Sequence, residues 1–169
     1  MSRINSKKKG NSYELRVSKI LSESLSPLTF KRVPHSGAYL GGSNSERSAD
    51  FNEDSATSLV GDIYCSNGKI KFIIESKFYK EAVKFTDLFN DNCQIFKWFN
   101  EAKFDCNKFK NKKPLLIFKY NRTDDYVCID YDLIKDKIPD NQMIIVKGLS
   151  ILKLEIFLTL GKIDWILHE

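Results

Sequence analysis

The spacing of apolar residues changes within the first 34 positions and separates a helix from a strand. After a basic start, apolar residues recur at roughly helical spacing at Tyr13, Leu15, Val17, Ile20 and Leu21. Ser12 is the predicted N-cap of this helix, and Pro27 ends it. Residues 29–34 are a predicted short strand, which stops at Pro34 because proline donates no ladder hydrogen bond.

A long polar stretch and two well-defined strands follow. Residues 35–58 are rich in Gly, Ser, Asn, Asp and Glu without periodicity, which predicts a long loop, either functional or disordered. The apolar runs at 59–65 and 69–77 are predicted strands. Asn67-Gly68 lies between them and favours the type I′ turn of a two-residue hairpin.

This hairpin determines which side chains share a face of the sheet. With Asn67-Gly68 as the turn, Asp62 faces Ile73. Because side chains alternate between faces, Glu75 and Lys77 lie on the same face as Asp62. The Asp62 and Glu75 Cα atoms are then diagonal neighbours, roughly 7–8 Å apart and within reach of one cation. The opposite face, toward the core, takes Ile63, Phe72 and Ile74.

The rest of the chain continues the alternation of helices and strands. A helix is predicted over about 83–103, with 90–92 as a candidate break. A short helix begins near Asp130 or Tyr131 and ends at Pro139, and a terminal apolar helix runs from a Ser150 cap to about Leu160, before Gly161. Strands are predicted at 115–120, 126–129 and 142–147. This order predicts an α/β fold, with a mixed central sheet flanked by helices.

The size and composition are those of one domain. A chain of 169 residues with 42% apolar residues can bury one sizeable core. Its apolar runs are far shorter than the roughly 20 residues of a membrane span, and its basic start lacks the apolar stretch of a secretory signal. We expect a cytoplasmic protein with no membrane partner. Residues 1–10 are expected to form a basic flexible arm and 11–169 a single domain, with a core of about 11–122 and an extension of about 123–169.

The number and spacing of the cysteines and histidines indicate which side chains could bind a metal. The four cysteines are far apart without a C-x-x-C pair, which predicts buried thiols rather than a zinc cluster or a disulfide framework. His35 and His168 are too few for a histidine-based site. A catalytic metal would therefore be held by carboxylates, and oxygen ligands favour Mg²⁺ or Mn²⁺.

The formal net charge of +5 is unevenly distributed. Residues 1–20 contain six basic residues and one acidic residue, residues 102–122 contain seven and one, and the remainder is net acidic. Two basic blocks suit a polyanion such as DNA, because phosphate contacts release counterions. The candidate DNA-binding lysines of these blocks are Lys7, Lys8, Lys9 and Lys119. The alternative is that both blocks are solvated surface.

Two carboxylates and a lysine on one face of an isoleucine-rich sheet need partners, because unpaired buried charges are costly. A divalent cation held by Asp62 and Glu75 meets this need and suits phosphodiester hydrolysis, since it polarises a phosphoryl oxygen and activates water. Lys77 would orient or deprotonate that water, or neutralise charge in the transition state. The alternative is an edge strand on which Glu75 and Lys77 form an exposed ion pair.

Four short motifs in a fixed order resemble one known family. They are Lys-Gly-x-x-x-Glu at 9–14, Arg-x-Pro-x-Ser-Gly at 32–37, Asp-Ile at 62–63 and Glu-x-Lys at 75–77. This order resembles that of archaeal-type Holliday-junction resolvases and their phage relatives, in the PD-(D/E)xK nuclease superfamily. The resemblance implies a restriction-endonuclease-like core. It also implies a Mg²⁺-dependent, structure-selective DNA endonuclease that forms a homodimer, leaves 5′-phosphates and accepts Mn²⁺ in place of Mg²⁺.

The resemblance also implies roles for individual residues. Asp62 and Glu75 would be metal ligands, with the backbone carbonyl of Ser76 as a third, and Lys77 would position the attacking water. Glu14 would be a helix-borne acid that reaches the metal directly or through water. The alternative for Glu14 is an ordinary exposed helix charge.

Arg32 and Ser36 would contact the scissile strand, whereas His35 is interpreted as a solvent-facing loop residue. The long stretch between Gly37 and Gly61 and the C-terminal extension depart from the family pattern. They leave open whether the DNA is branched or duplex. A sequence-specific restriction-like or homing endonuclease and a non-catalytic DNA-binding module on the same fold are the alternatives. The terminal apolar helix either supplies dimer surface or completes the monomer core.

Overall fold

The computed structural model describes residues 6–34 and 60–160. The first half of the chain forms α1 (Ser6–Ser24), β1 (Phe30–Arg32), β2 (Ile63–Cys65), β3 (Phe72–Tyr79), the 3₁₀ helix η2 (Phe85–Phe89) and α3 (Gln94–Cys106). The second half forms β4 (Lys113–Tyr120), β5 (Asp125–Asp130), the 3₁₀ helices η3 (Tyr131–Leu133) and η4 (Asp140–Gln142), β6 (Ile144–Val146), β7 (Leu149–Lys153) and α4 (Leu154–Thr159). Among the described residues, no helix is both long and apolar enough to cross a membrane.

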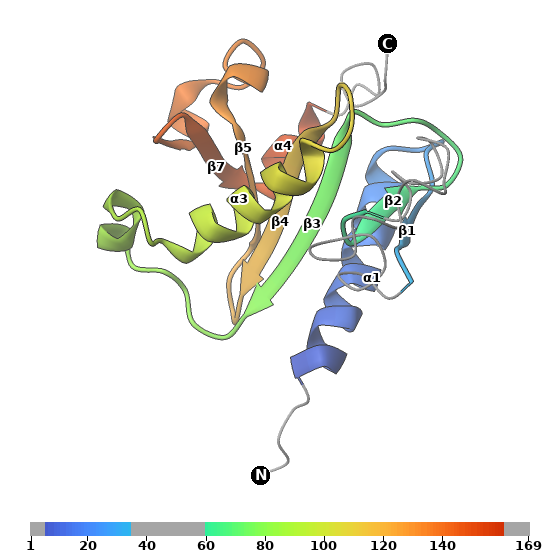
Figure 1. Ribbon diagram of the computed structural model, residues 1–169, viewed down its shortest axis with the longest axis horizontal. Helices are drawn as coiled ribbons and strands as arrows, with labels where there is room; N and C mark the ends of the chain where they lie inside the picture. The colour runs from blue at the N-terminus through green and yellow to red at the C-terminus, as the bar shows by residue number, and fades with distance from the viewer. Residues whose placement is uncertain (1–5, 35–59, 161–169) are drawn as a thin grey trace.

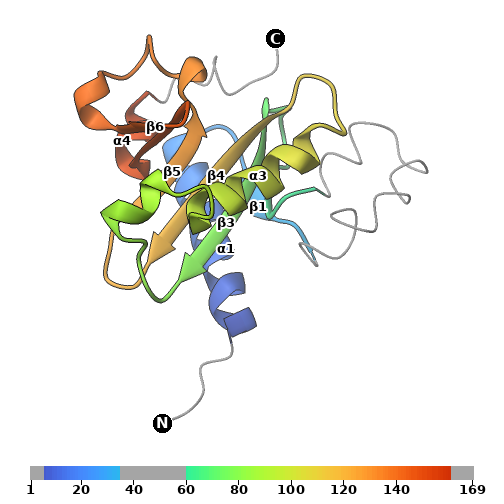
Figure 2. The same cartoon turned by 60° about the vertical axis from the view of Figure 1, so that its left-hand side comes forward.

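All strands join one mixed sheet in the order β1-β2-β3-β4-β5-β7-β6. β3 and β4 are parallel, and the other neighbouring pairs are antiparallel. Figures 1 and 2 place α3 and α1 on opposite sides of β3 and β4. The predicted α/β fold, a mixed sheet flanked by helices, is therefore confirmed.

Alternating side chains of the central strands build a core on each face of the sheet. On β4, Leu115 and Ile117 face α1 and α4, where they pack with residues such as Val17 and Phe157. Leu116 and Phe118 face α3 and pack with its aromatic residues. Burial on both faces explains why β4 is an almost continuous apolar run in the sequence.

Helix α1 begins earlier than the sequence indicated. The helix includes residues 6–10, which were expected to belong to a flexible arm. Ser12 is not an N-cap, because its hydroxyl donates to the Lys8 carbonyl inside the helix. The early turns have tertiary partners that the sequence pattern does not show. The Lys9 amine lies 3.8 Å from the centre of the Phe78 ring and donates to Asn121 at 2.8 Å.

The prediction of a tight hairpin at Asn67-Gly68 is wrong. Residues 66–71 connect β2 to β3. The Asn67 side chain accepts from the Thr29 amide at 2.7 Å and donates to the Pro27 carbonyl at 2.8 Å, so it holds the entry to β1. A two-residue hairpin occurs instead at Lys147-Gly148, between β6 and β7, where φ is +52° and +76°.

Two helix predictions also changed. The helix expected over 83–103 divides into η2 and α3, with the break at 90–92 that the ragged pattern had indicated. Ser150 is not a helix cap but lies inside β7, and α4 begins at Leu154. Apolar residues of this region are buried against both faces of the sheet, so the segment completes the monomer core. The predicted loop at 35–58 and the stop at Gly161 lie outside the described residues.

Candidate active site

The sheet opens where β2 and β3 separate. β2 pairs with β3 at Ile63 opposite Ile74, whereas β3 continues along β4 to Tyr79. Beyond this pairing the Ser76 amide donates to the Asp62 carboxylate at 2.8 Å instead of to a strand carbonyl. A side chain of the site thus replaces the missing ladder hydrogen bond.

Asp62 is held by its backbone as well as by its side chain. Its amide donates to the Ile74 carbonyl at 2.8 Å, and its carbonyl accepts from the Val33 amide at 2.9 Å. Gly61, just before it, has φ of +79°, and a Cβ there would lie 2.8 Å from the Ile74 carbonyl oxygen. Only glycine fits this conformation without displacing backbone, so the Gly-Asp pair is a structural requirement of the site.

Glu75 and Lys77 complete a compact charged group with Asp62. The Lys77 amine donates to the Glu75 carboxylate at 3.0 Å. Asp62 and Glu75 are only 7% and 9% exposed. Burial, and then repulsion from Asp62, raises the pKa of Glu75 to about 8. Although burial lowers it, the nearby carboxylates of Glu75 and Asp62 raise the pKa of Lys77 overall, which favours the ammonium form.

The prediction that these three side chains share a face is confirmed, but the predicted register is wrong. Asp62 lies beside Glu75 and interacts with it directly, instead of facing Ile73 and meeting Glu75 on a diagonal. The register differs because the connection from β2 to β3 is longer than two residues. The alternative of an exposed ion pair on an edge strand is wrong, since β3 lies between β2 and β4.

Glu14 lies on α1 and pairs with Arg32 of β1. The Arg32 guanidinium donates to the Glu14 carboxylate and, at 3.0 Å, to the Asn11 side chain. Glu14 is buried, so the alternative of an ordinary exposed helix charge is wrong. Asn11 was not identified from the sequence, although its position one turn before Glu14 places both on one helix face.

The two carboxylates fit a hard divalent cation. Mg²⁺ in proteins uses one or two carboxylates and keeps several waters. Asp62 and Glu75 supply two buried, mutually repelling carboxylates. Because Ile74 turns its carbonyl to Asp62 and carbonyl directions alternate along a strand, Ser76 turns its carbonyl to the same side. Within 6–34 and 60–160, no group of three or more His, Cys, Asp or Glu side chains is placed to hold a metal.

Comparison with known proteins identifies the family of this chain. Residues 5–164 match the family described as "Phage putative PDDEXK endonuclease". The chain belongs to this family. It is therefore a nuclease, and the predicted membership of the PD-(D/E)xK nucleases is confirmed. The assignment of Asp62, Glu75 and Lys77 to that motif stays a prediction.

Two individual proteins are similar to this nuclease. Protein D14 of Escherichia phage T5 is 33% identical over 144 residues, which cover 83% of this chain and 78% of that protein. The structure of Hjc, a Holliday junction resolvase from the archaeal hyperthermophile Archaeoglobus fulgidus, aligns with a TM-score of 0.40 and 12% identity. That alignment covers 88% of this chain and 91% of the resolvase chain.

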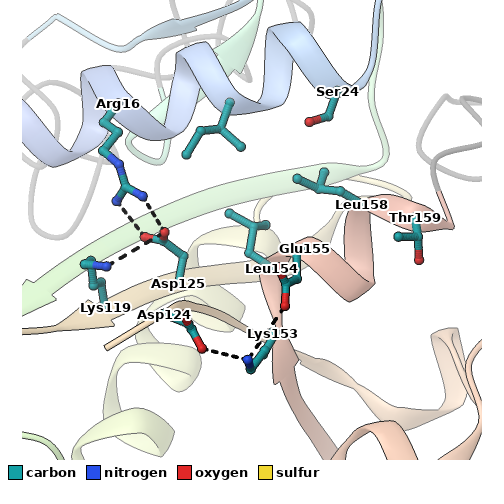
Figure 3. A pocket seen from close by; sticks show the side chains of 11 residues that line it. Arg16, Ser24, Lys119, Asp124, Asp125, Lys153, Leu154, Glu155, Leu158 and Thr159 are labelled. Carbon is teal, nitrogen blue, oxygen red and sulfur yellow. Dashed lines mark hydrogen bonds and ion pairs between the residues drawn. The ribbon is translucent and has the colours of Figure 1, made fainter. Parts of the chain in front are cut away.

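Lys119 of the nuclease belongs to a different ionic cluster. A cleft of about 530 Å³ lies between α1 and α4, and Lys119, Arg16 and Asp125 line it (Figure 3). The Lys119 amine donates to the Thr123 carbonyl and lies 3.9 Å from Asp125. The Lys119 ammonium is therefore paired mainly with groups of the protein itself, which the basic sequence block did not indicate.

The other predicted DNA-binding lysines lie on α1. Lys8 is exposed on α1, Lys9 contacts Phe78, and Lys7 belongs to the first turn of the same helix. Ser36 lies outside the described residues, as does His35. All four cysteines are free thiols. The prediction of buried thiols is confirmed for Cys93, Cys106 and Cys128, whereas Cys65 is only partly buried.

Proposed function

We propose that this nuclease is a metal-dependent DNA endonuclease that hydrolyses phosphodiester bonds at the opening between β2 and β3. The observation that carries the proposal is the contact between two buried carboxylates, Asp62 and Glu75, beside the Lys77 ammonium. Such a group is costly without a cation and suited to one. Asp62, Glu75 and the Ser76 carbonyl would hold Mg²⁺, with Mn²⁺ as a substitute.

A cation bound there would polarise the scissile phosphate and lower the pKa of the attacking water. The protein's own residues supply the rest. Asp62 and Glu75 fix the position of the site, because the Ser76 amide and Lys77 hold the two side chains in place. Lys77, as an ammonium, donates hydrogen bonds to the water or to a phosphate oxygen and offsets the negative charge that develops there.

Glu14 and Arg32 serve the same reaction from the other side of the opening in this proposal. Their ion pair joins α1 to β1 one residue before Val33, whose amide holds the Asp62 carbonyl. Arg32 would turn from Glu14 to the phosphate of the scissile strand when DNA binds, and Ser36 would contact the same strand. Glu14 would then face the bound cation directly or through water.

The proposed substrate is branched DNA, cut by a homodimer. Support comes from the order of the four sequence motifs, which resembles that of junction resolvases. Cutting both strands of a junction requires two active sites, which a homodimer provides by symmetry. Lys7, Lys8 and Lys9 at the start of α1 would contact the DNA backbone and raise affinity without regard to sequence.

The test compares a four-way junction with a linear duplex of the same arm sequence, with Mg²⁺ and with EDTA. We expect Mg²⁺-dependent cleavage that favours the junction. Asp62→Asn and Glu75→Gln should lower the rate by roughly 100-fold or more, because each removes charge from the metal site. Glu155→Gln is the control, since that carboxylate is exposed on α4.

Wild-type protein that cuts neither substrate in Mg²⁺ would refute the enzymatic proposal. Cleavage confined to one sequence, with junctions ignored, would replace branched DNA with a sequence-specific target. Cleavage that survives both substitutions would show that the carboxylates have no catalytic role.

A further inference from the structure

An aromatic side chain stands exposed on α3. Phe104 is 62% exposed, whereas the helix buries its other aromatic residues, Phe96, Trp98 and Phe99, against the sheet. Exposed phenylalanines are common singly, so exposure alone indicates nothing. The position of Phe104 on α3 and the charged residues near it are what suggest a binding role.

Phe104 lies along the part of α3 that borders the candidate active site. Glu101 interacts electrostatically with Lys77, and Cys106 packs against Ile73 and hydrogen-bonds to its backbone. Phe104 lies between these two contacts, about 4.5 Å along the helix axis from Glu101 at 1.5 Å per residue. Phe104 therefore lies on the same segment of α3 as the residue that interacts with Lys77, with its ring turned to solvent.

One lysine contacts this ring, and two more are close to it in the sequence. The Lys108 amine lies 4.9 Å from the centre of the Phe104 ring and 2.7 Å from the Asp105 carboxylate. Lys103, in the turn before Phe104, and Lys110, beyond the helix end, are exposed. We call Lys103, Phe104, Lys108 and Lys110 the Phe104 platform.

We propose that the Phe104 platform binds a nucleic-acid strand beside the active site, with an unpaired base stacked on the Phe104 ring. Aromatic rings bind any base through its π-face, and lysines bind the flanking phosphates. The inference rests on the proposed function and sharpens its substrate to DNA with an unpaired nucleotide near the cleaved bond, as occurs at a branch point.

The charge of the Phe104 platform favours a nucleic-acid strand over a second copy of the chain as its binding partner. A symmetric contact between two Phe104 platforms would bring the exposed Lys103 and Lys110 of one copy close to those of the other, whereas Lys108 is paired with Asp105. Like charges placed together oppose such an interface. A nucleic-acid strand presents the opposite charge together with the flat apolar surface that the ring requires.

The experiment uses a four-way junction that carries 2-aminopurine beside the branch point, in EDTA so that no cleavage occurs. Stacking on a ring quenches the fluorescence of this base analogue. Phe104→Ala and Phe104→Leu should remove the quenching and weaken binding about fivefold to 150-fold, and Phe104→Trp should restore both. Phe89→Ala is the matched control, because Phe89 is 66% exposed but lies on η2, before α3.

The outcomes separate this inference from the proposed function. If wild-type protein cleaves DNA with Mg²⁺ but Phe104→Ala leaves quenching and affinity unchanged, the inference is wrong and the function stands. Equal loss in Phe89→Ala would also refute it. If wild-type protein sediments as a dimer and Phe104→Ala as a monomer, the surface binds protein instead. Absence of both DNA binding and cleavage in the wild type would refute the proposed function itself.

Discussion

Gly61 and Gly148 share a left-handed backbone but differ in what surrounds them. Their φ angles are +79° and +76°, yet a Cβ would meet the Ile74 carbonyl at Gly61 and nothing within 4 Å at Gly148. Gly148→Ala should therefore cost about 1 kcal/mol from backbone strain alone. Gly61→Ala should cost about 3 kcal/mol, since steric overlap adds to the strain. Urea unfolding of both variants measures this, and equal losses would contradict the close approach at Gly61.

The raised pKa of Glu75 gives metal-free protein a distinctive pH dependence. Between about 4.5 and 8, the folded state holds a proton that the unfolded state has lost. The folded state therefore binds more protons, and its stability falls as pH rises through this window. Glu75→Gln removes this contribution. In EDTA, the unfolding temperature of wild type should fall more steeply from pH 5 to 8.5 than that of the variant. Parallel curves would contradict a buried, protonated Glu75.

At the scale of single residues, the sequence predicted which side chains share a face but not the register that pairs them. Asp62, Glu75 and Lys77 share a face as side-chain alternation requires, and a register shift of two positions preserves that parity. The pairing of Glu14 with Arg32 was not predictable, because it joins elements whose relative placement depends on packing. The role of Asn67 was not predictable for the same reason, because its side chain hydrogen-bonds to the segment before β1 instead of forming a tight turn.

At the scale of elements, Asp125 of β5 connects this strand to α1 through hydrogen bonds. It accepts a hydrogen bond from Tyr13 at 2.9 Å. It also accepts hydrogen bonds from both terminal nitrogens of Arg16 (Figure 3). Arg16 is about half exposed, whereas Asp125 is mostly buried. Asp125→Ala should cost about 2–3 kcal/mol by leaving these donors without their acceptor. Arg16→Ala should cost about 1 kcal/mol or less. Thermal unfolding of both variants gives the comparison, and similar losses would mean that Asp125 is not the centre of the cluster.

Helix and strand boundaries were hardest to predict where tertiary contacts override local signals. Ser150 precedes an apolar run like a helix cap, but the hairpin at Lys147-Gly148 pairs that run with β5 and β6 instead. The central strand β4 was easy, because burial on both faces leaves a continuous apolar run. Local patterns therefore determined the interior of the sheet but not its last strand.

At the scale of the whole molecule, cation binding should be linked to folding. A cation that binds only the folded site raises stability, and it must displace the proton from Glu75. We expect Mg²⁺ or Ca²⁺ to raise the unfolding temperature more at pH 8.5 than at pH 6.5. Asp62→Asn should remove most of the effect, whereas Glu155→Gln should retain it. Equal stabilisation of wild type and Asp62→Asn would place the cation elsewhere.

The order of elements as far as β6 was largely predictable from the sequence, and so was one mixed sheet between helices. The arrangement of β5, β7 and β6 beyond β4 was not, because long-range pairing leaves little trace in local patterns. The basic blocks were only a partial guide to DNA-binding residues. Lys119, the lysine of the second block that was predicted to bind DNA, instead donates to a carbonyl of the protein itself.

The hydrogen bond from the Ser76 amide to Asp62 has a genetic consequence. Asparagine keeps an acceptor oxygen at this position, so Asp62→Asn preserves the hydrogen bond while removing the charge. Aspartate and asparagine codons differ by a single nucleotide. Under the proposed role of Asp62, descendants of this gene that retain the fold and DNA binding but have lost cleavage are therefore one point mutation away. Alanine at the same position would damage the fold as well, and selection would remove it more readily.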